Sequence, residues 1–335
     1  MAIGFDVGTY NLVACTRDDK KNFVHNREVN AFLELPINEG FVFKMMKDAG
    51  VPLIERDGTA YALGEAAVKI AYDMNQELKR PMSGGCVNPK EKDAYQILSI
   101  MIHSLIGDVA KDKETLFYCV PANAVNEETD ADYHQKILEA IFKAYKSKDG
   151  HTVDAHPINE AQALVYAELG AKAYTGIGIS FGAGMVNVCY STLGSPVFKF
   201  AIVNSGDWID RQAAKACGES PTYINQEKTK IDLTKPPANL VERAIQTQYR
   251  VMIEKTVQGI KKGVTESGAK ARGDKPVDVV IAGGTSLPNG FDGLFKEVLT
   301  QAALPIKIGE VKRPADALYS VARGCLIAAE SSVKS

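Results

Sequence analysis

A pattern of strand, glycine turn and strand occurs twice in this chain, about half the chain length apart. The first copy has apolar runs at residues 2–7 and 12–16, joined by a turn that contains Gly8. The second copy has such runs at 177–181 and 186–190, joined by a turn with two glycines. Two apolar runs on either side of a short glycine turn are typical of a β-hairpin. The repetition therefore predicts two similar lobes, each built around one hairpin.

Helical patterns occupy the segments between the predicted strands. Apolar residues recur at intervals close to 3.6 in three segments, 95–106, 133–144 and 159–169. Longer helical patterns and further strands complete the chain (helices at 240–262 and 315–330, strands at 197–203 and 277–282). Strands that alternate with helices predict an α/β fold. A length of 335 residues fits two domains of ~150 residues each.

Composition excludes several classes of protein. The net charge of −2 argues against a dedicated nucleic-acid binder, which normally carries a basic patch or stripe. No run of about 18 apolar residues is present, so we expect no membrane insertion. The N-terminus enters a strand without a basic and apolar leader, so we expect no signal peptide. The six cysteines form no CxxC pair, and a reducing, cytoplasmic location is expected.

Four motif matches are set aside in favour of simpler interpretations. Residues 178–182 fit GxSxG, but all five histidines precede Ser180 and a strand pattern follows. Residues 182–187 lack the third glycine of GxGxxG. Residues 263–270 resemble a P-loop with one extra residue, and a surface loop is preferred. A metal site is possible in one polar cluster, but ordinary polar residues at a strand end are favoured (His151, Asp154 and His156).

Three glycine turns remain, and each follows a predicted buried strand. They lie at 8–9, 182–184 and 283–285. Glycine allows close approach of the backbone, so such turns can present N–H groups to an anion. Each turn alone is also compatible with an ordinary tight hairpin. The three together, with Asp6 just before the first, predict a nucleotide held between two lobes.

The three glycine turns and the segments near them resemble the superfamily of actin, sugar-kinase and heat-shock-chaperone ATPases. The resemblance covers the first phosphate loop, the connecting helix, the second phosphate loop, the helix after it and the adenosine motif (residues 6–11, 157–161, 182–184, 206–210 and 281–286). Intervening segments resemble the bacterial actins, MreB and its magnetosome relatives in particular (80–85, 120–122, 227–230 and 321–324). The resemblance spans nearly the whole chain.

This resemblance implies a two-lobed actin-like fold with ATP and Mg²⁺ in the cleft between the lobes. Each lobe would be a mixed β-sheet flanked by helices, with a small inserted subdomain. The first lobe would comprise residues 1–155 and the returning helix 314–332, with its subdomain at about 33–80. The second would comprise 156–313, with its subdomain at about 207–274.

The resemblance also assigns roles to individual residues. Asp6 would face Mg²⁺ through water, and Glu160 would orient the water that attacks the γ-phosphate. Glu160 alone is also compatible with a solvated acid in the first turn of a helix. Glu227 and Lys230 would contact the ribose and base, although an exposed ion pair is an alternative. The remaining nucleotide contacts would come from the turns (Gly8, Thr9, Tyr10, Asn11, Gly182, Ala183, Gly184, Gly206, Asp207, Gly283, Gly284 and Thr285).

The second phosphate loop departs from the superfamily pattern, which usually opens with Asp and later carries Thr and an acid. This chain has Ser180, in the place equivalent to Asp6, followed by Met185, Val186 and Asn187. Ser180 would therefore be only a weak metal residue. We expect nucleotide binding to persist and hydrolysis to be slow.

The function that these features favour is an ATP-binding protein that hydrolyses ATP slowly and self-assembles into homopolymeric cytoskeletal filaments. No substrate-binding domain is recognised after the final predicted helix, which favours a filament over a monomeric chaperone-type ATPase switch. A pseudo-ATPase scaffold is the other alternative, because of the altered second loop. A sugar kinase fits less well, since no catalytic base for it is recognised. The sequence identifies no cargo or adaptor protein.

Overall fold

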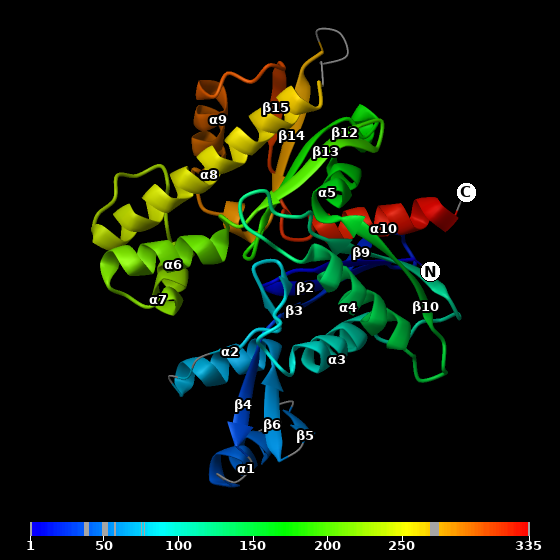
Figure 1. Cartoon of the computed structure of the whole chain (residues 1–335). Coiled ribbons are helices and arrows are strands. Elements are labelled where there is room, and N and C mark those ends of the chain that lie inside the picture. Colours follow the sequence, from blue (N-terminus) through cyan, green and yellow to red (C-terminus); the bar gives the residue numbers. More distant parts are fainter. Residues whose placement is uncertain are drawn as a thin grey trace.

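Two five-stranded sheets form the centre of the computed structural model (Figure 1). The structure describes residues 2–36, 40–48, 53–56, 58–74, 76, 78–268 and 275–333. The first sheet has the order β10 (Val153–Asn159), β9 (Glu114–Val120), β1 (Ile3–Val7), β2 (Asn11–Arg17) and β3 (Phe23–Val29). The second has the order β13 (Ser195–Ile202), β12 (Val186–Thr192), β11 (Gly176–Phe181), β14 (Val277–Ala282) and β15 (Ile308–Lys312).

The two sheets repeat the same pairing and register, which confirms the prediction of two similar lobes. In each sheet the central strand, β1 or β11, pairs antiparallel with its hairpin partner and parallel with a later strand. Asp6 lies opposite Val13 in the first hairpin, and Ser180 lies opposite Asn187 in the second. The turns are closed alike, because each opens with a glycine N–H that donates to a carbonyl three residues later, at 3.0 Å in both.

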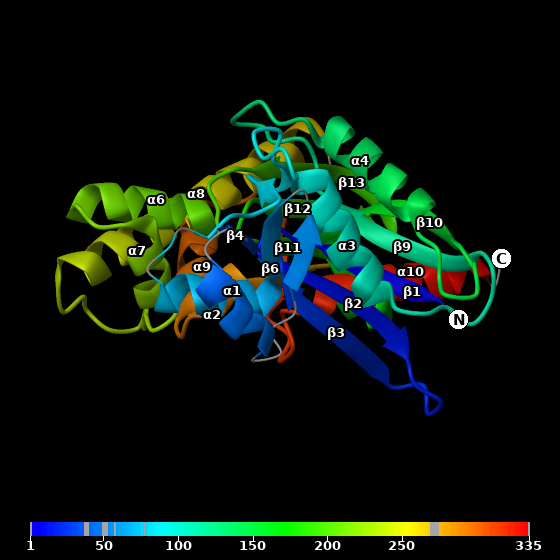
Figure 2. The same ribbon diagram turned by 90° about the horizontal axis from the view of Figure 1, so that it is seen from below.

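Two helices cover the first sheet and two more lie between the lobes. The helices α3 (Ala94–Ile106) and α4 (Ala131–Ala144) lie side by side in both views (Figures 1 and 2) and share a core with β1 and β9. The helix α10 (Ser320–Val333) packs against α5 (Glu160–Glu168), β1 and β9. The contact between α10 and α5 is close, since a Cβ added at Gly324 would lie 1.7 Å from the carbonyl oxygen of Ala163.

The helices of the second lobe share one hydrophobic core with their sheet. They are α6 (Gly206–Cys217), α7 (Pro221–Lys228), α8 (Leu240–Glu266) and α9 (Phe291–Gln301), with two short 3₁₀ turns, η1 (Gly170–Lys172) and η2 (Gly284–Ser286). Ile209 of α6, Ile224 of α7 and Ile253 of α8 belong to the same buried cluster as Ile179 of the central strand. The segment predicted as a second subdomain therefore has no separate core of its own among the described residues.

A small third sheet with its own core is inserted in the first lobe. It has the order β4 (Phe32–Pro36), β6 (Thr59–Leu63) and β5 (Leu53–Arg56), with the helices α1 (Gly40–Asp48) and α2 (Gly64–Asp73) beside it. Leu33, Leu35, Ala62 and Ile70 form its buried cluster. A two-stranded ribbon of β7 (Met82–Ser83) and β8 (Cys86–Val87) follows. Figure 1 shows this insertion projecting away from the second lobe.

The largest differences from the predicted helix boundaries are at two helices. The last helix begins at Ser320 rather than at residue 315, because the segment before it forms turns, and Gly283 N donates to the Ala317 carbonyl at 3.3 Å. The helix α8 continues to Glu266, beyond the predicted end at 262. Residues 269–274 of the predicted surface loop lie outside the described residues. Within the described part of the chain, no helix is long and apolar enough to cross a membrane.

Candidate functional site

A cavity of about 280 Å³ lies between the two lobes, where both hairpin turns meet. Its wall combines the ends of β1 and β11, the start of α5, the η2 loop and the segment before α10. The turns touch, since a Cβ at Gly184 would lie 2.3 Å from Thr9 Oγ1 and 2.2 Å from Gly85 N. Most of the predicted site residues line this cavity (Asp6, Gly8, Thr9, Tyr10, Asn11, Glu160, Ser180, Gly182, Ala183, Gly184, Asp207, Gly283, Gly284 and Thr285).

The first turn is fixed through its carbonyl oxygens by Asn30, which the sequence analysis did not identify. Asn30 Nδ2 donates to the Gly8 carbonyl at 3.0 Å, and Asn30 N donates to the Tyr10 carbonyl at 2.8 Å. The Asn30 side chain is fully buried. The carbonyls of this turn are therefore directed into the protein.

The second turn is fixed in the same way by other elements. Gly206 N and Thr285 Oγ1 donate to the Gly182 carbonyl at 3.1 and 2.9 Å. Asp207 N donates to the Ala183 carbonyl at 2.8 Å. Gly283 lies close to the backbone of Phe181, with φ of +91°. A Cβ at this position would lie 2.4 Å from the Phe181 carbonyl oxygen, so only glycine fits.

These bonds leave the donors of both turns available. Among the described residues, no protein acceptor is bound by the backbone N–H groups of Thr9, Tyr10, Ala183 and Gly184. A cavity bordered by such N–H groups from two facing turns attracts an anion with several oxygens. The arrangement is typical of a phosphate site.

Asp6 lies near the end of β1, half-buried at the cavity wall. Cys119 Sγ donates to Asp6 Oδ1 at 3.0 Å and accepts from Val7 N at 3.2 Å. Burial raises the pKa of Asp6 to about 6, and the hydrogen bond from Cys119 opposes this rise. The carboxyl group is thus held in place but only partly solvated at the cavity wall.

Glu160 is the first residue of α5 and faces the same cavity. Asn159 caps the helix, because its side chain accepts from Gln162 N at 3.2 Å. Ser180 Oγ donates to Glu160 Oε1 at 2.6 Å, and Asn187 Nδ2 donates to Oε2 at 2.8 Å. Burial, and then the nearby Asp6 charge, raise the pKa of Glu160 to about 8.

The charges around the cavity favour a cation beside Asp6 and Glu160. The basic side chains around it already pair with other acids: Arg27 with Glu65 at 2.6 Å, Lys228 with Asp210 at 2.7 Å and Arg80 with Asp207 at 3.0 Å. Asp6 and Glu160 form no ion pair within the described residues. Two half-buried carboxyls with raised pKa values and no basic partner among the described residues suit a divalent cation, which prefers oxygen ligands.

Arg80 links the lobes at the edge of the cavity. Its Nη1 donates to both carboxylate oxygens of Asp207, at 3.0 and 3.2 Å, and its guanidinium lies 4.9 Å from the centre of the Tyr10 ring. Tyr10 belongs to the first turn and Asp207 to the first turn of α6. The pair therefore closes the cleft across both turns.

Three predicted contacts are not where the prediction placed them. Glu227 and Lys230 pair with each other at 2.8 Å, with side chains 31% and 69% exposed, and neither lines the cavity. Lys228 and Thr229 line it instead. A spacing of three residues indicates a shared face but not the direction of that face, and the structure shows the exposed ion pair that was the alternative for these two residues. Gly206 also lies outside the cavity wall and acts by fixing the second turn.

Ser180 lines the cavity, but its hydroxyl donates to Glu160. Two lining residues, Gly85 and Pro121, come from segments whose resemblance to bacterial actins was noted without a site role. Other lining residues come from distant segments for which the sequence carried no signal (Arg27, Asn225, Leu287, Ala317 and Leu318). The polar cluster of His151, Asp154 and His156 makes ordinary polar contacts within the protein. His156 pairs with Asp154 at 3.2 Å, and His151 contacts the Val109 carbonyl.

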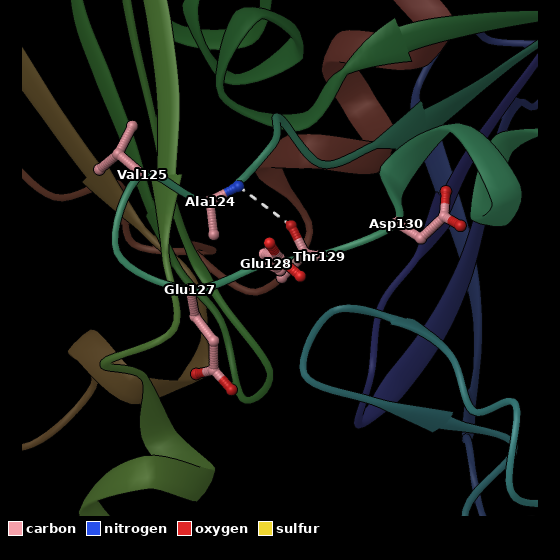
Figure 3. A pocket seen from close by; sticks show the side chains of 6 residues that line it. All are labelled: Ala124, Val125, Glu127, Glu128, Thr129 and Asp130. Atoms are coloured by element: carbon pink, nitrogen blue, oxygen red, sulfur yellow. Dashed lines mark hydrogen bonds between the residues drawn. The ribbon is translucent and has the colours of Figure 1, made fainter.

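A second hollow, on the loop after β9, does not offer a comparable site. Ala124 N donates to Thr129 Oγ1 at 3.1 Å across the loop (Figure 3). Figure 3 shows Val125 and Glu127 pointing away from Thr129. Because its polar side chains do not converge, this hollow is less suited to a ligand than the interlobe cavity.

Comparison with known proteins assigns the family. The model of the Volactin family matches residues 1–329. The chain belongs to the Volactin family. No curated protein sequence matches it.

Solved structures similar to this Volactin-family chain share its fold. A structure titled "MamK double helical filament" has a TM-score of 0.70 and 15% identity, covering 98% of both chains. MreB5 of Spiroplasma citri bound to AMPPNP has a TM-score of 0.65 and 14% identity, over 99% and 96% of the chains. EutJ from Carboxydothermus hydrogenoformans has a TM-score of 0.55 and 14% identity, over 98% and 89%. The predicted two-lobed actin-like fold is therefore confirmed.

Proposed function

We propose that this Volactin-family protein binds ATP with Mg²⁺ in the interlobe cavity, hydrolyses it slowly and assembles into cytoplasmic filaments. The observation that carries the proposal is the pair of facing turns, whose carbonyls are fixed and whose N–H groups are available beside Asp6 and Glu160. Structures of MreB5 with AMPPNP and with ADP support a nucleotide as the ligand.

The triphosphate would lie between the two turns. Thr9 and Tyr10 would donate from the first lobe, and Ala183 and Gly184 from the second. An anion that needs donors from both lobes holds them together, which couples binding to closure of the cleft.

The base and ribose would lie toward the η2 loop. Leu287 and Leu318 provide apolar surface there, and Asn225, Lys228 and Thr229 provide polar groups. The cavity of about 280 Å³ is at the lower end of small-molecule sites, ~300–1,000 Å³. The ion pair of Arg80 with Asp207 must therefore loosen for a nucleotide to enter.

Asp6 would hold Mg²⁺ through water, beside the β- and γ-phosphates. When bound, the cation neutralises charge that develops on the phosphates during hydrolysis. A positive charge at this place also lowers the pKa of Asp6 and Glu160, which are poorly solvated without it.

Glu160 would orient the attacking water. Both of its oxygens already accept hydrogen bonds from the protein, so a water must share an oxygen with Ser180 or Asn187. The raised pKa of the Glu160 carboxyl favours slow turnover, because a protonated carboxyl cannot accept a proton from the attacking water. It also favours a second candidate, a scaffold that binds ATP without hydrolysing it.

Filament assembly is supported by the fold comparison. The MamK match is a double helical filament, and another match is a non-polymerising mutant of MamK bound to AMPPNP. In that protein, nucleotide binding does not require polymerisation. Head-to-tail contacts that do not close generate filaments, so a chain of this fold can assemble from a single species.

Light scattering, negative-stain electron microscopy and phosphate release test the proposal on one protein series. Wild type and Asp6→Asn are compared without nucleotide, with ATP and with ADP, all in Mg²⁺. Asn keeps the size of the side chain at the contact with Cys119 but removes the charge. We expect filaments and slow phosphate release only for wild type with ATP.

The outcomes separate the candidate functions. Filaments with ATP but no phosphate release would favour the scaffold. Phosphate release from a protein that stays monomeric would favour a chaperone-type switch. Absence of both, with no ATP binding, would refute the proposal.

A further inference from the structure

Two side chains that depart from the superfamily pattern both bind the same carboxylate. Ser180 and Asn187 stand where that pattern usually has acidic side chains, and each donates to a different oxygen of Glu160. We propose that Ser180 and Asn187 are positioning residues that hold the Glu160 carboxylate in one orientation for hydrolysis. This inference rests on the proposed function, because it concerns the same site.

The local fold brings the three residues together. Ser180 on β11 and Asn187 on β12 are directly paired across the hairpin. The helix α5 can begin beside this pair because residue 178 is a glycine. A Cβ at that position would lie 2.6 Å from the Ala161 carbonyl oxygen. Glu160, the residue before Ala161, therefore extends between the two donors.

The orientation of the Asn187 amide is fixed by a third contact. Its Oδ1 accepts from Ala122 N at 3.0 Å, so Nδ2 is the end that reaches Glu160. Ala122 follows β9 of the first lobe, whereas Asn187 belongs to the second. The Asn187 side chain thus connects the Glu160 carboxylate to both lobes. Ser180 and Asn187 are 2% and 1% exposed, so water does not replace either donor.

An acid at either place could not make these contacts. An ionised carboxylate has no proton to donate and would repel Glu160 at 2.6–2.8 Å. The serine and the asparagine therefore provide the donors that the Glu160 carboxylate accepts, and they do not replace a metal ligand. Ser180 hydrogen-bonds to Glu160, and Asp6 remains the acid beside the cation.

Kinetic measurements on single variants test the roles of the two donors. Ser180→Ala removes one donor, and Asn187→Ala removes the other without adding a charge beside Glu160. We expect each to lower kcat by about tenfold, as for loss of a buried hydrogen bond to a charged group. The Kd for ATP should change less than about threefold, because the contact acts on the attacking water. Ser180→Thr keeps the hydroxyl and should retain activity.

The matched control is Ser191→Ala, on the same hairpin. Ser191 is also fully buried, and its hydroxyl donates to the Ser195 carbonyl at 3.3 Å, away from the cavity. This change should leave kcat unaltered. A general loosening of the hairpin would lower kcat in the control as well and would overturn the inference.

A spectroscopic measurement tests the contacts without nucleotide. Infrared spectra of protein with ¹³C-labelled glutamate, with Glu160→Gln to identify the band, report hydrogen bonding to this carboxyl group. Ser180→Ala and Asn187→Ala should each shift the Glu160 band toward that of a less hydrogen-bonded carboxyl, and Ser191→Ala should not.

Two further results would overturn the inference. One is faster hydrolysis by Ser180→Asp than by wild type, since that would identify the position as a metal acid. The other is an unchanged Glu160 band together with unchanged kcat in both donor variants. If wild type binds no ATP, the proposed function fails, and the infrared band still decides whether Ser180 and Asn187 hold Glu160.

Discussion

Replacing Glu160 with glutamine should stabilise the ligand-free protein, and more so at high pH. Burial and the neighbouring Asp6 raise the pKa of Glu160 from 4.5 to about 8. A carboxyl with a raised folded-state pKa binds its proton more tightly in the folded than in the unfolded chain. Its effect on stability is absent below pH 4.5 and becomes an increasing penalty as the pH rises toward 8.

The size of the effect follows from these two values. Proton linkage gives a penalty of ~4 kcal/mol at pH 7.5 and below ~1 kcal/mol at pH 5. Glutamine carries no charge at either pH and fits the contacts. Its Oε1 can accept from Asn187 Nδ2, and its amide can donate to the Ser180 hydroxyl, which turns to accept. At ~2 °C per kcal/mol for a large chain, the advantage in Tm should be about 6 °C larger at pH 7.5 than at pH 5.

Thermal unfolding followed by fluorescence in EDTA, without nucleotide, measures this difference. Glu127→Gln is the control, because Glu127 is exposed on the loop after β9. It should leave Tm unchanged at both pH values. A Tm difference between Glu160→Gln and wild type that is the same at pH 5 and pH 7.5 would refute the argument.

Three further changes test how the cavity is built. Gly184→Ala inserts a methyl group where the two turns touch, so calorimetry should show ATP affinity reduced by at least about tenfold; Gly293→Ala, which meets open space on α9, should not alter it. Asn30→Ala releases the first turn and should weaken ATP binding with a loss of about 1–3 kcal/mol in unfolding free energy, measured by urea titration; unchanged affinity would contradict the role of Asn30. Arg80→Ala removes the interlobe pair with Asp207 and should accelerate release of a fluorescent nucleotide, measured by stopped flow. Arg80→Lys should not restore the slow release, because lysine lacks the planar guanidinium.

The sequence was sufficient to predict the repeated halves of the fold. The hairpin patterns place Asp6 and Ser180 equivalently, and the strand pairing has the same register in both copies. Glycine turns after buried strands were a strong signal because backbone geometry allows few other residues there. Local chemistry therefore predicted both turns of the cavity.

The remaining site residues depend on contacts between distant segments. Asn30 reaches the first turn from the end of β3, and Arg80 reaches Asp207 from the other lobe. Neither contact has a local pattern. The contact of Ser180 and Asn187 with Glu160 needs both the hairpin register and the packing of α5 against β11. The sequence therefore indicated a departure at these places but not its purpose.

The proposed function depends on binding of ATP with Mg²⁺ in the interlobe cavity. Calorimetric titration of ATP into dilute wild-type protein, with and without Mg²⁺, measures this binding. We expect saturable binding of one nucleotide per chain, stronger with Mg²⁺ and weakened in Asp6→Asn. Absence of binding heat at ATP concentrations of about 1 mM, where even weak sites with a Kd near that value fill to about half, would contradict it.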